Sequence, residues 1–115
     1  MPKFVLLLRD ASNAYPNMSP DQMQAIVQRY VAWRGKVQAN GGSIMGHKLR
    51  DKQGRVVSGT GGALKVTDGP YAEAREVMGG LFVIEAASYD EIVALTQDCP
   101  HLEFGSIEIR EVQPT

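Results

Sequence analysis

Two side chains that could exchange protons with a substrate, Asp68 and His101, lie in short polar motifs of the C-terminal half. Asp68 belongs to the segment VTDGPYAEAREVMGG, and His101 follows Cys99 and Pro100 in the motif CPH. A carboxylate beside an imidazole orients the ring and favours its charged form. If the fold brings the two together, His101 could act as a general acid or base, with Asp68 as its orienting partner.

Other polar side chains could bind a substrate at the same place. Tyr71, Glu73 and Arg75 closely follow the Asp-Gly-Pro turn, and Arg9 ends the first apolar run of the chain. Either arginine could hold a substrate carboxylate as a bidentate pair. These residue types predict acid–base chemistry on a small anionic ligand, and we expect no cofactor.

Each of these residues also has a purely structural interpretation. Asp68 can bond its own backbone in an Asx-turn, with Gly69 at positive φ. His101 can cap the last carbonyl groups of a preceding helix, and Glu73 is consistent with a solvated segment. The segment could then bind a ligand or a partner protein without turnover, or only shape a subunit interface.

Composition restricts the class of protein. A chain of 115 residues suits one domain, residues 1–115, with one core. Hydrophobic residues make up 43% and charged residues 22%, as in soluble globular proteins. The formal net charge of −1 argues against nucleic acid as a partner, because such binders normally carry a basic excess.

The cysteine and histidine content limits metal and redox chemistry. Cys99 is the single cysteine, so an intramolecular disulfide is excluded. The two histidines, His47 and His101, lack the short spacing of a helical or strand metal site, and we expect no metal. The apolar run at residues 4–8 is too short for a signal segment or a membrane span. We expect a cytoplasmic protein with no membrane partner.

Apolar periodicity predicts the elements that must position these side chains. Residues 3–9 and 81–86 are almost continuously apolar, which is typical of central strands. Ser19 and Pro20 begin a helix over residues 20–39, because a hydroxyl N-cap and proline at the first position both favour a helix start. The remaining elements are strands at 43–49, 55–58, 63–67 and 107–112, and a helix that Ser88 caps and Pro100 ends.

The order β-α-β, inserted hairpin, β-α-β predicts a ferredoxin-like α+β fold. In that topology Arg9, the insertion 51–80 and residues 99–101 lie at one end of the sheet, which places Asp68 near His101. Helices cover one face of such a sheet and leave the other bare. Apolar side chains on the bare face, which we expect to be Phe4 or Val5, Leu6 or Leu7, Phe82 and Ile84, predict a homodimer.

The pieces TDGPYAEAREVMGG, LFVIEA, SYDE, CPH and the last strand together resemble the YCII-related superfamily. More closely they resemble its branch named for an Asp-Gly-Pro-Phe motif, with Tyr71 in place of the phenylalanine. The resemblance covers nearly the whole chain, since the first strand and first helix also fit. It implies a ferredoxin-like subunit, a dimer whose sheets meet in an α+β barrel, and a cleft with Asp and His, here Asp68 and His101.

The resemblance also implies two kinds of function. Some YCII-type proteins carry out dehalogenase or lactone-processing chemistry on small cyclic acids, which would make the chain an enzyme. Members of the Asp-Gly-Pro-Phe branch are often encoded beside extracytoplasmic-function sigma factors in bacteria, which suggests a regulatory, ligand-binding module instead. Both functions stay open at the level of sequence.

Overall fold

The computed structural model describes residues 1–11, 17–40, 42–50, 53–69 and 76–114, with side chains of the last range described from residue 78 onward. In chain order the elements are β1 (Lys3–Ala11), α1 (Pro20–Ala39), β2 (Ile44–Lys48), β3 (Arg55–Ser58), the 3-10 turn η1 (Gly61–Ala63), β4 (Lys65–Asp68), β5 (Glu76–Glu85), α2 (Tyr89–Thr96), the 3-10 turn η2 (Pro100–Glu103) and β6 (Gly105–Glu111). This succession confirms the predicted β-α-β, hairpin, β-α-β order.

The main sheet has the strand order β2-β5-β1-β6, and every neighbouring pair is antiparallel. The two most apolar strands, β1 and β5, therefore lie in the middle, as their composition predicted. Their register places Phe4 opposite Ile84 and Leu6 opposite Phe82. The architecture is α+β and ferredoxin-like, with a hairpin inserted between the two halves.

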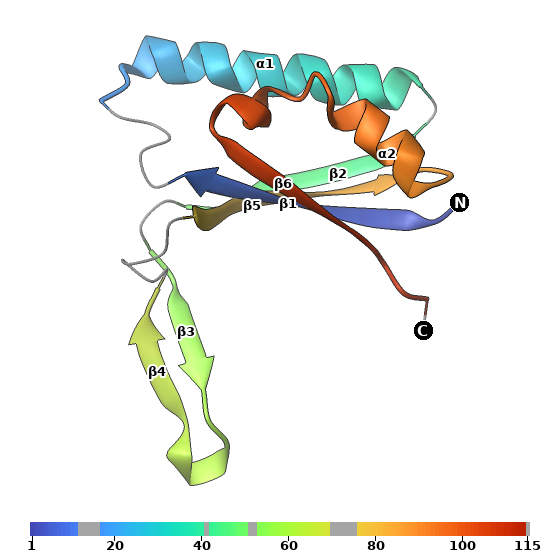
Figure 1. Ribbon diagram of the computed structural model, residues 1–115. Helices are drawn as coiled ribbons and strands as arrows, with labels where there is room; N and C mark the ends of the chain where they lie inside the picture. The colour runs from blue at the N-terminus through green and yellow to red at the C-terminus, as the bar shows by residue number, and fades with distance from the viewer. Residues whose placement is uncertain (12–16, 41, 51–52, 70–75, 115) are drawn as a thin grey trace.

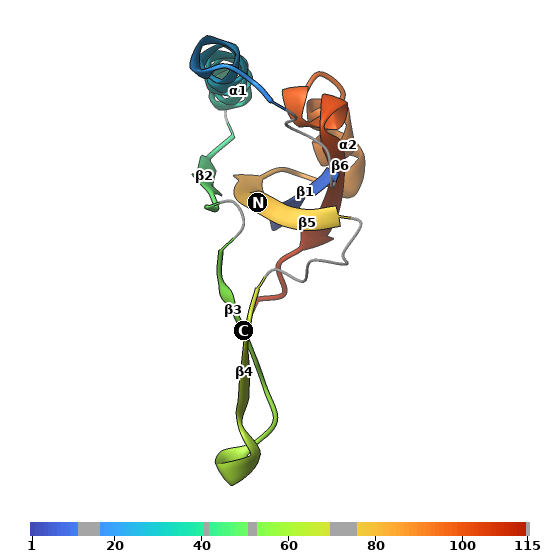
Figure 2. The same cartoon turned by 90° about the vertical axis from the view of Figure 1, so that its left-hand side faces the viewer.

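Both helices cover the same face of this sheet (Figures 1 and 2). Between them and the strands lies a core of eleven buried residues: Phe4, Leu6, Leu8, Trp33, Val37, Ile44, Phe82, Ile84, Ala86, Ile92 and Cys99. In the strands the buried side chains alternate with more exposed ones, since successive side chains point to opposite faces. No helix among the described residues combines the length and apolar character needed to cross a membrane.

The helix N-termini follow the predicted local signals. Ser19 accepts a hydrogen bond from the Gln22 backbone N–H at 3.1 Å, and the Gln22 side chain accepts one from the Ser19 N–H, which completes a capping box. Ser88 caps α2 in the same way through the N–H of Glu91. The second helix ends at Thr96, earlier than predicted, and Pro100 begins η2 instead of ending α2.

The inserted hairpin, β3 and β4, forms a separate two-stranded sheet. It extends away from the body of the molecule on the side that the helices do not cover (Figures 1 and 2). Its apolar side chains Val57, Leu64 and Val66 are more than half exposed. The insertion therefore does not fold back over the sheet within this chain.

The uncovered face of the main sheet carries apolar residues that differ in part from the predicted ones. Strand alternation places Val5, Leu7, Leu81 and Val83 there, half-buried, while the predicted Phe82 and Ile84 are buried under the helices. The prediction was wrong for these two because the register of β5 could not be read from a continuous apolar run. The apolar character of the face itself is confirmed.

Candidate functional site

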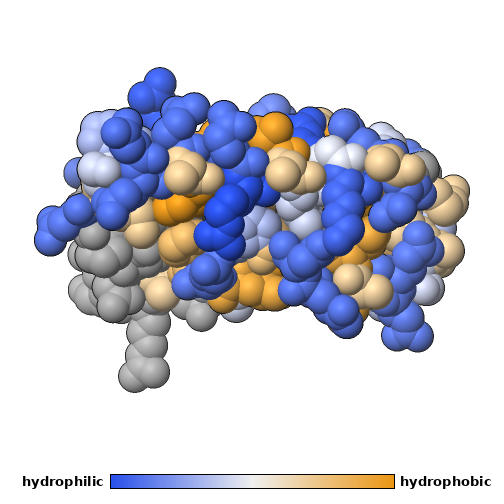
Figure 3. All heavy atoms as spheres, turned by 90° about the horizontal axis from the view of Figure 1, so that it is seen from above, coloured by the Kyte–Doolittle hydropathy of each residue, from blue (hydrophilic) through white to orange (hydrophobic). Residues whose placement is uncertain are grey.

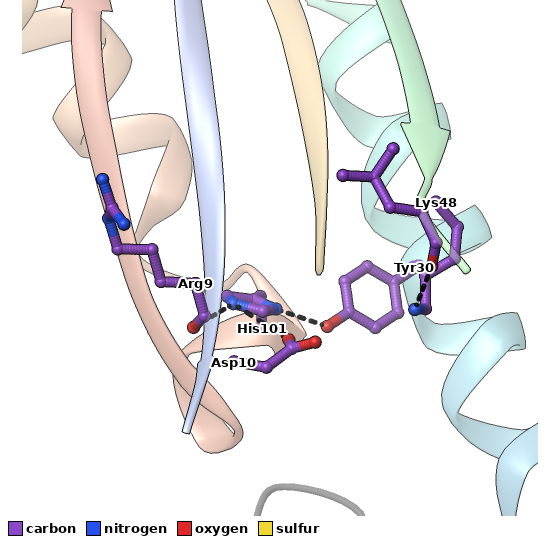
Figure 4. A network of polar contacts seen from close by, with 6 residues as sticks. Arg9, Asp10, Tyr30, Lys48 and His101 are labelled. Carbon is purple, nitrogen blue, oxygen red and sulfur yellow. Dashed lines mark hydrogen bonds and ion pairs between the residues drawn. The ribbon is translucent and has the colours of Figure 1, made fainter. Parts of the chain in front are cut away.

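His101 is the most buried polar side chain of the described core, with 2% of its surface exposed. The turn η2 holds it under the end of β1. Its Nε2 lies 2.9 Å from the backbone carbonyl oxygen of Arg9, and its Nδ1 lies 2.9 Å from the hydroxyl oxygen of Tyr30 on α1 (Figure 4). A buried imidazole with both nitrogens bonded is a fixed part of the structure, in contrast to an exposed helix cap.

These two partners determine where the ring carries its proton. A carbonyl oxygen can only accept a hydrogen bond, so Nε2 must be the protonated nitrogen of the neutral ring. Nδ1 then has a lone pair and accepts from the Tyr30 hydroxyl, which donates. When the ring is charged, Nδ1–H donates and the Tyr30 oxygen accepts.

Asp10 supplies the carboxylate nearest to this ring. Its Oδ1 lies 3.8 Å from Nε2 of His101, and its side chain is only 14% exposed. At this distance a carboxylate favours the charged form of an imidazole and would stabilise an imidazolium. Figure 4 shows Asp10 below the ring, between His101 and the Tyr30 hydroxyl.

A β-bulge makes room for the Asp10 side chain. Leu8 pairs with Gly80 but Arg9 pairs with Met78, so Gly79 is an extra residue in β5. A Cβ added at Gly79 would overlap the carboxylate of Asp10. The first of the two glycines that end the segment VTDGPYAEAREVMGG is therefore required by the packing of Asp10.

A pocket of about 260 Å³ opens beside these polar groups, between α1 and the strands β1, β2 and β5. Its wall on the helix side is apolar, from Met23, Ile26, Val27 and Val31, and the sheet side adds Leu8 and Phe82. Three glycines, Gly46, Gly79 and Gly80, line the pocket from the sheet, and a Cβ at each would overlap the Phe82 ring, the Asp10 carboxylate and the His47 carbonyl oxygen, respectively. Tyr30, Asp10 and His101 form its polar end.

Basic side chains stand at another part of the same pocket. Arg34 and Lys48 are among its lining residues, whereas His47 pairs with Leu81, so strand alternation directs its side chain to the uncovered face. Lys48 Nζ donates to the carbonyl oxygen of Leu49 at 2.7 Å, and Arg34 Nη2 lies 3.4 Å from the carbonyl oxygen of Ile44. A mostly apolar pocket with a few polar groups at defined positions is the usual form of a small-molecule binding site.

The family model for the YCII-related domain matches residues 2–115 of the chain. The chain belongs to the YCII-related family. No protein with a curated description matches its sequence. The match is to the superfamily and does not separate its branches, so membership of the Asp-Gly-Pro-Phe branch stays a prediction.

In this YCII-related chain the predicted pair of Asp68 and His101 does not come together. Asp68 ends β4 on the hairpin, where its side chain is 91% exposed and lies 3.4 Å from Nη1 of Arg55. The carboxylate beside His101 is that of Asp10. The hairpin that carries Asp68 extends away from the body of the molecule, so the shared end of the fold does not bring Asp68 to His101 (Figure 1).

The predicted substrate-binding residues have different outcomes. The Arg9 side chain points away from His101 and its Nη2 lies 2.8 Å from Oε1 of Glu108, so only its backbone carbonyl takes part in the site. Tyr71, Glu73 and Arg75 lie outside the described residues. His101 is the predicted residue that the structure places in the pocket.

Sequence reasoning missed the roles of Asp10 and Tyr30. Asp10 lies on the same face of β1 as Leu6 and Leu8, and this alternation was available in the sequence. The sequence of α1 has an apolar stripe at spacings of three and four residues, formed by Met23, Ile26, Tyr30, Trp33 and Val37. Tyr30 was assigned to this stripe, although a buried tyrosine hydroxyl usually needs a polar partner. Asking for that partner would have indicated a polar group opposite α1.

The single cysteine is separate from this chemistry. Cys99 is 3% exposed and belongs to the core, and desolvation by burial raises the pKa of its thiol to about 11. The described residues contain no cluster of three or more His, Cys, Asp or Glu side chains that could hold a metal ion.

Proposed function

We propose that this YCII-related protein is an enzyme that uses His101 for acid–base chemistry, without a cofactor, on a small substrate bound in the pocket beside α1. The proposal rests on the arrangement of Tyr30, His101 and Asp10 at the polar end of that pocket. The Tyr30 hydroxyl oxygen lies 2.9 Å from one nitrogen of the buried imidazole, and the Asp10 carboxylate lies 3.8 Å from the other. Asp10 takes the orienting role that was predicted for Asp68.

The pocket supports a small ligand that is anionic or cyclic. Its apolar walls suit a ring or a short hydrocarbon, and its volume of about 260 Å³ is near the lower end for small-molecule pockets. Arg34 and Lys48 supply positive charge for a carboxylate or a similar group. These two residues replace Arg9 and Arg75 in the proposal.

Hydrogen–deuterium exchange tests for this chemistry without knowledge of the product. A panel of small cyclic carboxylic acids and lactones is incubated with the protein in D₂O and followed by proton NMR. We expect the wild-type protein to catalyse exchange or conversion of at least one compound. General acid–base catalysis contributes about 10²–10⁴-fold, so His101→Gln and Asp10→Asn should lower the rate by that order.

Asp98→Asn is a matched control, because Asp98 is a carboxylate outside this pocket whose pKa is lowered by its hydrogen bond to Lys36. It should leave exchange unchanged. Binding of panel compounds without exchange or conversion would contradict the enzyme proposal. That outcome would support the ligand-binding regulatory module, for which a sigma factor is the partner to examine.

We also propose that the protein is a homodimer that buries the uncovered sheet face. Val5, Leu7, Leu81 and Val83 lie on that face, and the hairpin with its exposed apolar side chains extends on the same side (Figure 1). Adjacent apolar surfaces of this kind usually mark an interface. A two-stranded hairpin is also marginally stable alone, so a second subunit would stabilise it.

Sedimentation velocity at micromolar concentration tests the dimer. The wild-type protein should sediment as a dimer, and Leu7→Lys should shift it to a monomer because it places a charge in the interface. Val93→Lys is the control, since Val93 is 49% exposed on α2 and lies on the opposite side. A monomeric wild-type protein would overturn the proposal.

A further inference from the structure

We propose that Tyr30 is the group that exchanges a proton with the ligand, and that His101 stores this proton behind it. The inference rests on the proposed acid–base function of the pocket and concerns which atom performs it. Nothing in the sequence pattern assigned a chemical role to Tyr30, which lies in the apolar stripe of α1.

The imidazole nitrogens of His101 are not directly accessible to a ligand. His101 is 2% exposed, and both nitrogens are bonded to protein atoms at 2.9 Å. A ligand could reach Nε2 or Nδ1 only after one of these bonds had broken. Tyr30 is half-buried and lines the pocket, and its hydroxyl group points toward the His101 ring (Figure 4).

The hydrogen bond between Tyr30 and His101 can run in either direction. With neutral His101, Tyr30 donates its hydroxyl hydrogen to Nδ1, and its oxygen can accept a hydrogen from the ligand through a lone pair. With charged His101, Nδ1–H donates to the Tyr30 oxygen, and the hydroxyl hydrogen is turned to the ligand. The protonation state of His101 therefore decides whether Tyr30 accepts or donates in the pocket.

The proton transfer follows from these two states. The bond between a ligand atom and its hydrogen breaks as the hydrogen forms a bond to the Tyr30 oxygen. The original O–H bond of Tyr30 breaks at the same time, and that hydrogen forms a bond to Nδ1 of His101. The ligand becomes an anion and His101 an imidazolium, so one proton has moved and charge is conserved.

Asp10 and Arg9 act on the stored proton as positioning residues. The carbonyl oxygen of Arg9 accepts from Nε2–H in both states, which keeps the ring orientation constant. The Asp10 carboxylate, 3.8 Å from Nε2, stabilises the imidazolium by its opposite charge. Return of the proton through Tyr30 to the ligand regenerates the neutral ring and completes the cycle.

The location of the imidazole proton tests the inference without any ligand in the site. Protein labelled with ¹⁵N-histidine is studied by long-range proton–nitrogen NMR at a pH at which the rings are neutral, with His47→Gln used to assign the two histidines. We expect hydrogen on Nε2 of His101 and none on Nδ1. A hydrogen on Nδ1 of the neutral ring would overturn the relay, because Tyr30 could then not donate to it.

The second test uses 4-nitrophenol as a probe, because its neutral and ionised forms absorb at different wavelengths and its size suits the pocket. It is titrated with protein at a pH below its own pKa. We expect the wild-type protein to bind the phenolate and the His101 NMR signals to move to those of an imidazolium. In Tyr30→Phe the probe should still bind, but the bound ratio of phenolate to phenol should fall about tenfold or more.

Tyr89→Phe is the control, since Tyr89 lies outside the pocket and its hydroxyl accepts from the Glu111 N–H. It should ionise the probe as the wild-type protein does. Equal ionisation in Tyr30→Phe, or binding without ionisation in the wild-type protein, would overturn the relay and leave the pocket function in place. A wild-type protein that does not bind 4-nitrophenol would contradict the pocket function itself, and the relay with it.

Discussion

The segments of α1 before and after residue 32, here called its N-terminal and C-terminal halves, carry the same apolar stripe but have different roles. In the C-terminal half, Trp33 and Val37 are 4% and 1% exposed and belong to the core. In the N-terminal half, Ile26 and Tyr30 are half-buried, and Val27 is 49% exposed. Seen from the helix side, apolar surface accordingly shows between the hydrophilic side chains (Figure 3).

The difference comes from the sheet opposite the helix. Trp33 packs edge-on against Phe82, with ring centroids 5.3 Å apart, and its Nε1 donates to the carbonyl oxygen of Leu95 at 2.9 Å. The N-terminal half faces the pocket, whose sheet side includes Gly79 and Gly80. An apolar stripe therefore predicts which face of a helix is buried. The residues of the sheet opposite that face decide whether it forms a core or a pocket.

The largest expected effect is the loss of the packed half. Trp33→Ala removes a buried ring and leaves the Leu95 carbonyl without its donor, and we expect a loss of about 3–5 kcal/mol of unfolding free energy. Val31→Ala in the other half removes a side chain that is 59% exposed and should cost less than about 0.5 kcal/mol. Urea denaturation of both variants measures the contrast, and equal losses would show that the two halves pack alike.

A smaller effect is expected when a glycine of the sheet is filled. A Cβ at Gly46 would overlap the ring of Phe82, and overpacking of this kind costs about 1–3 kcal/mol. Gly35→Ala is the control, because a Cβ there meets nothing within 4 Å and alanine favours a helix by about 0.5–1 kcal/mol. Thermal unfolding should therefore shift in opposite directions for Gly46→Ala and Gly35→Ala.

Ile26→Ala tests the half of α1 that lines the pocket. Because Ile26 lines the pocket and is only half-buried, we expect its truncation to lower the unfolding free energy by about 1 kcal/mol or less. The affinity for 4-nitrophenol, measured by equilibrium dialysis, should fall several-fold, because each methylene that the ligand buries contributes about 0.8 kcal/mol. Val93→Ala on α2 is the control, and an equal fall in its affinity would contradict the assigned binding site.

The smallest effect concerns Cys99 at the packed end. Burial raises the pKa of its thiol to about 11, so the native thiol should react slowly with dithionitrobenzoate at pH 8 and rapidly after unfolding in urea. Because the unfolded thiol ionises first, stability should be independent of this group below about pH 9 and fall between pH 9 and 11. Rapid reaction of the native protein would show that this end of the core opens readily.

Most of the fold followed from local signals. Ser19, Pro20 and Ser88 began the helices where they were expected, and the two continuously apolar segments became the central strands. Which side chains of those strands face the helices was harder to predict, because a run such as LLL has no polar–apolar alternation. Phe82 and Ile84 were placed on the wrong face for this reason.

The site was predicted only in part. His101 was identified, and its helix-end position suggested polar partners, but the partner carboxylate was not Asp68. A contact between distant segments depends on register, and the bulge at Gly79 shifts the register of β5 by one residue beside Arg9. A glycine inside a strand suggests a bulge, but the shift in pairing is fixed only when β5 pairs with β1.

Sequence alone determined the family, the order of elements and the presence of one buried-strand pair, because caps, periodicity and motif spacing are local. The tertiary structure decided that VTDGPYAEAREVMGG contributes its last two glycines to the pocket while Asp68 lies on the hairpin. It also decided that Asp10 and Tyr30 meet His101. The physical reason is that a buried imidazole must form hydrogen bonds with the groups that packing places beside it. Those groups, the Tyr30 hydroxyl and the Arg9 carbonyl oxygen, reach His101 only once α1, β1 and η2 are packed together.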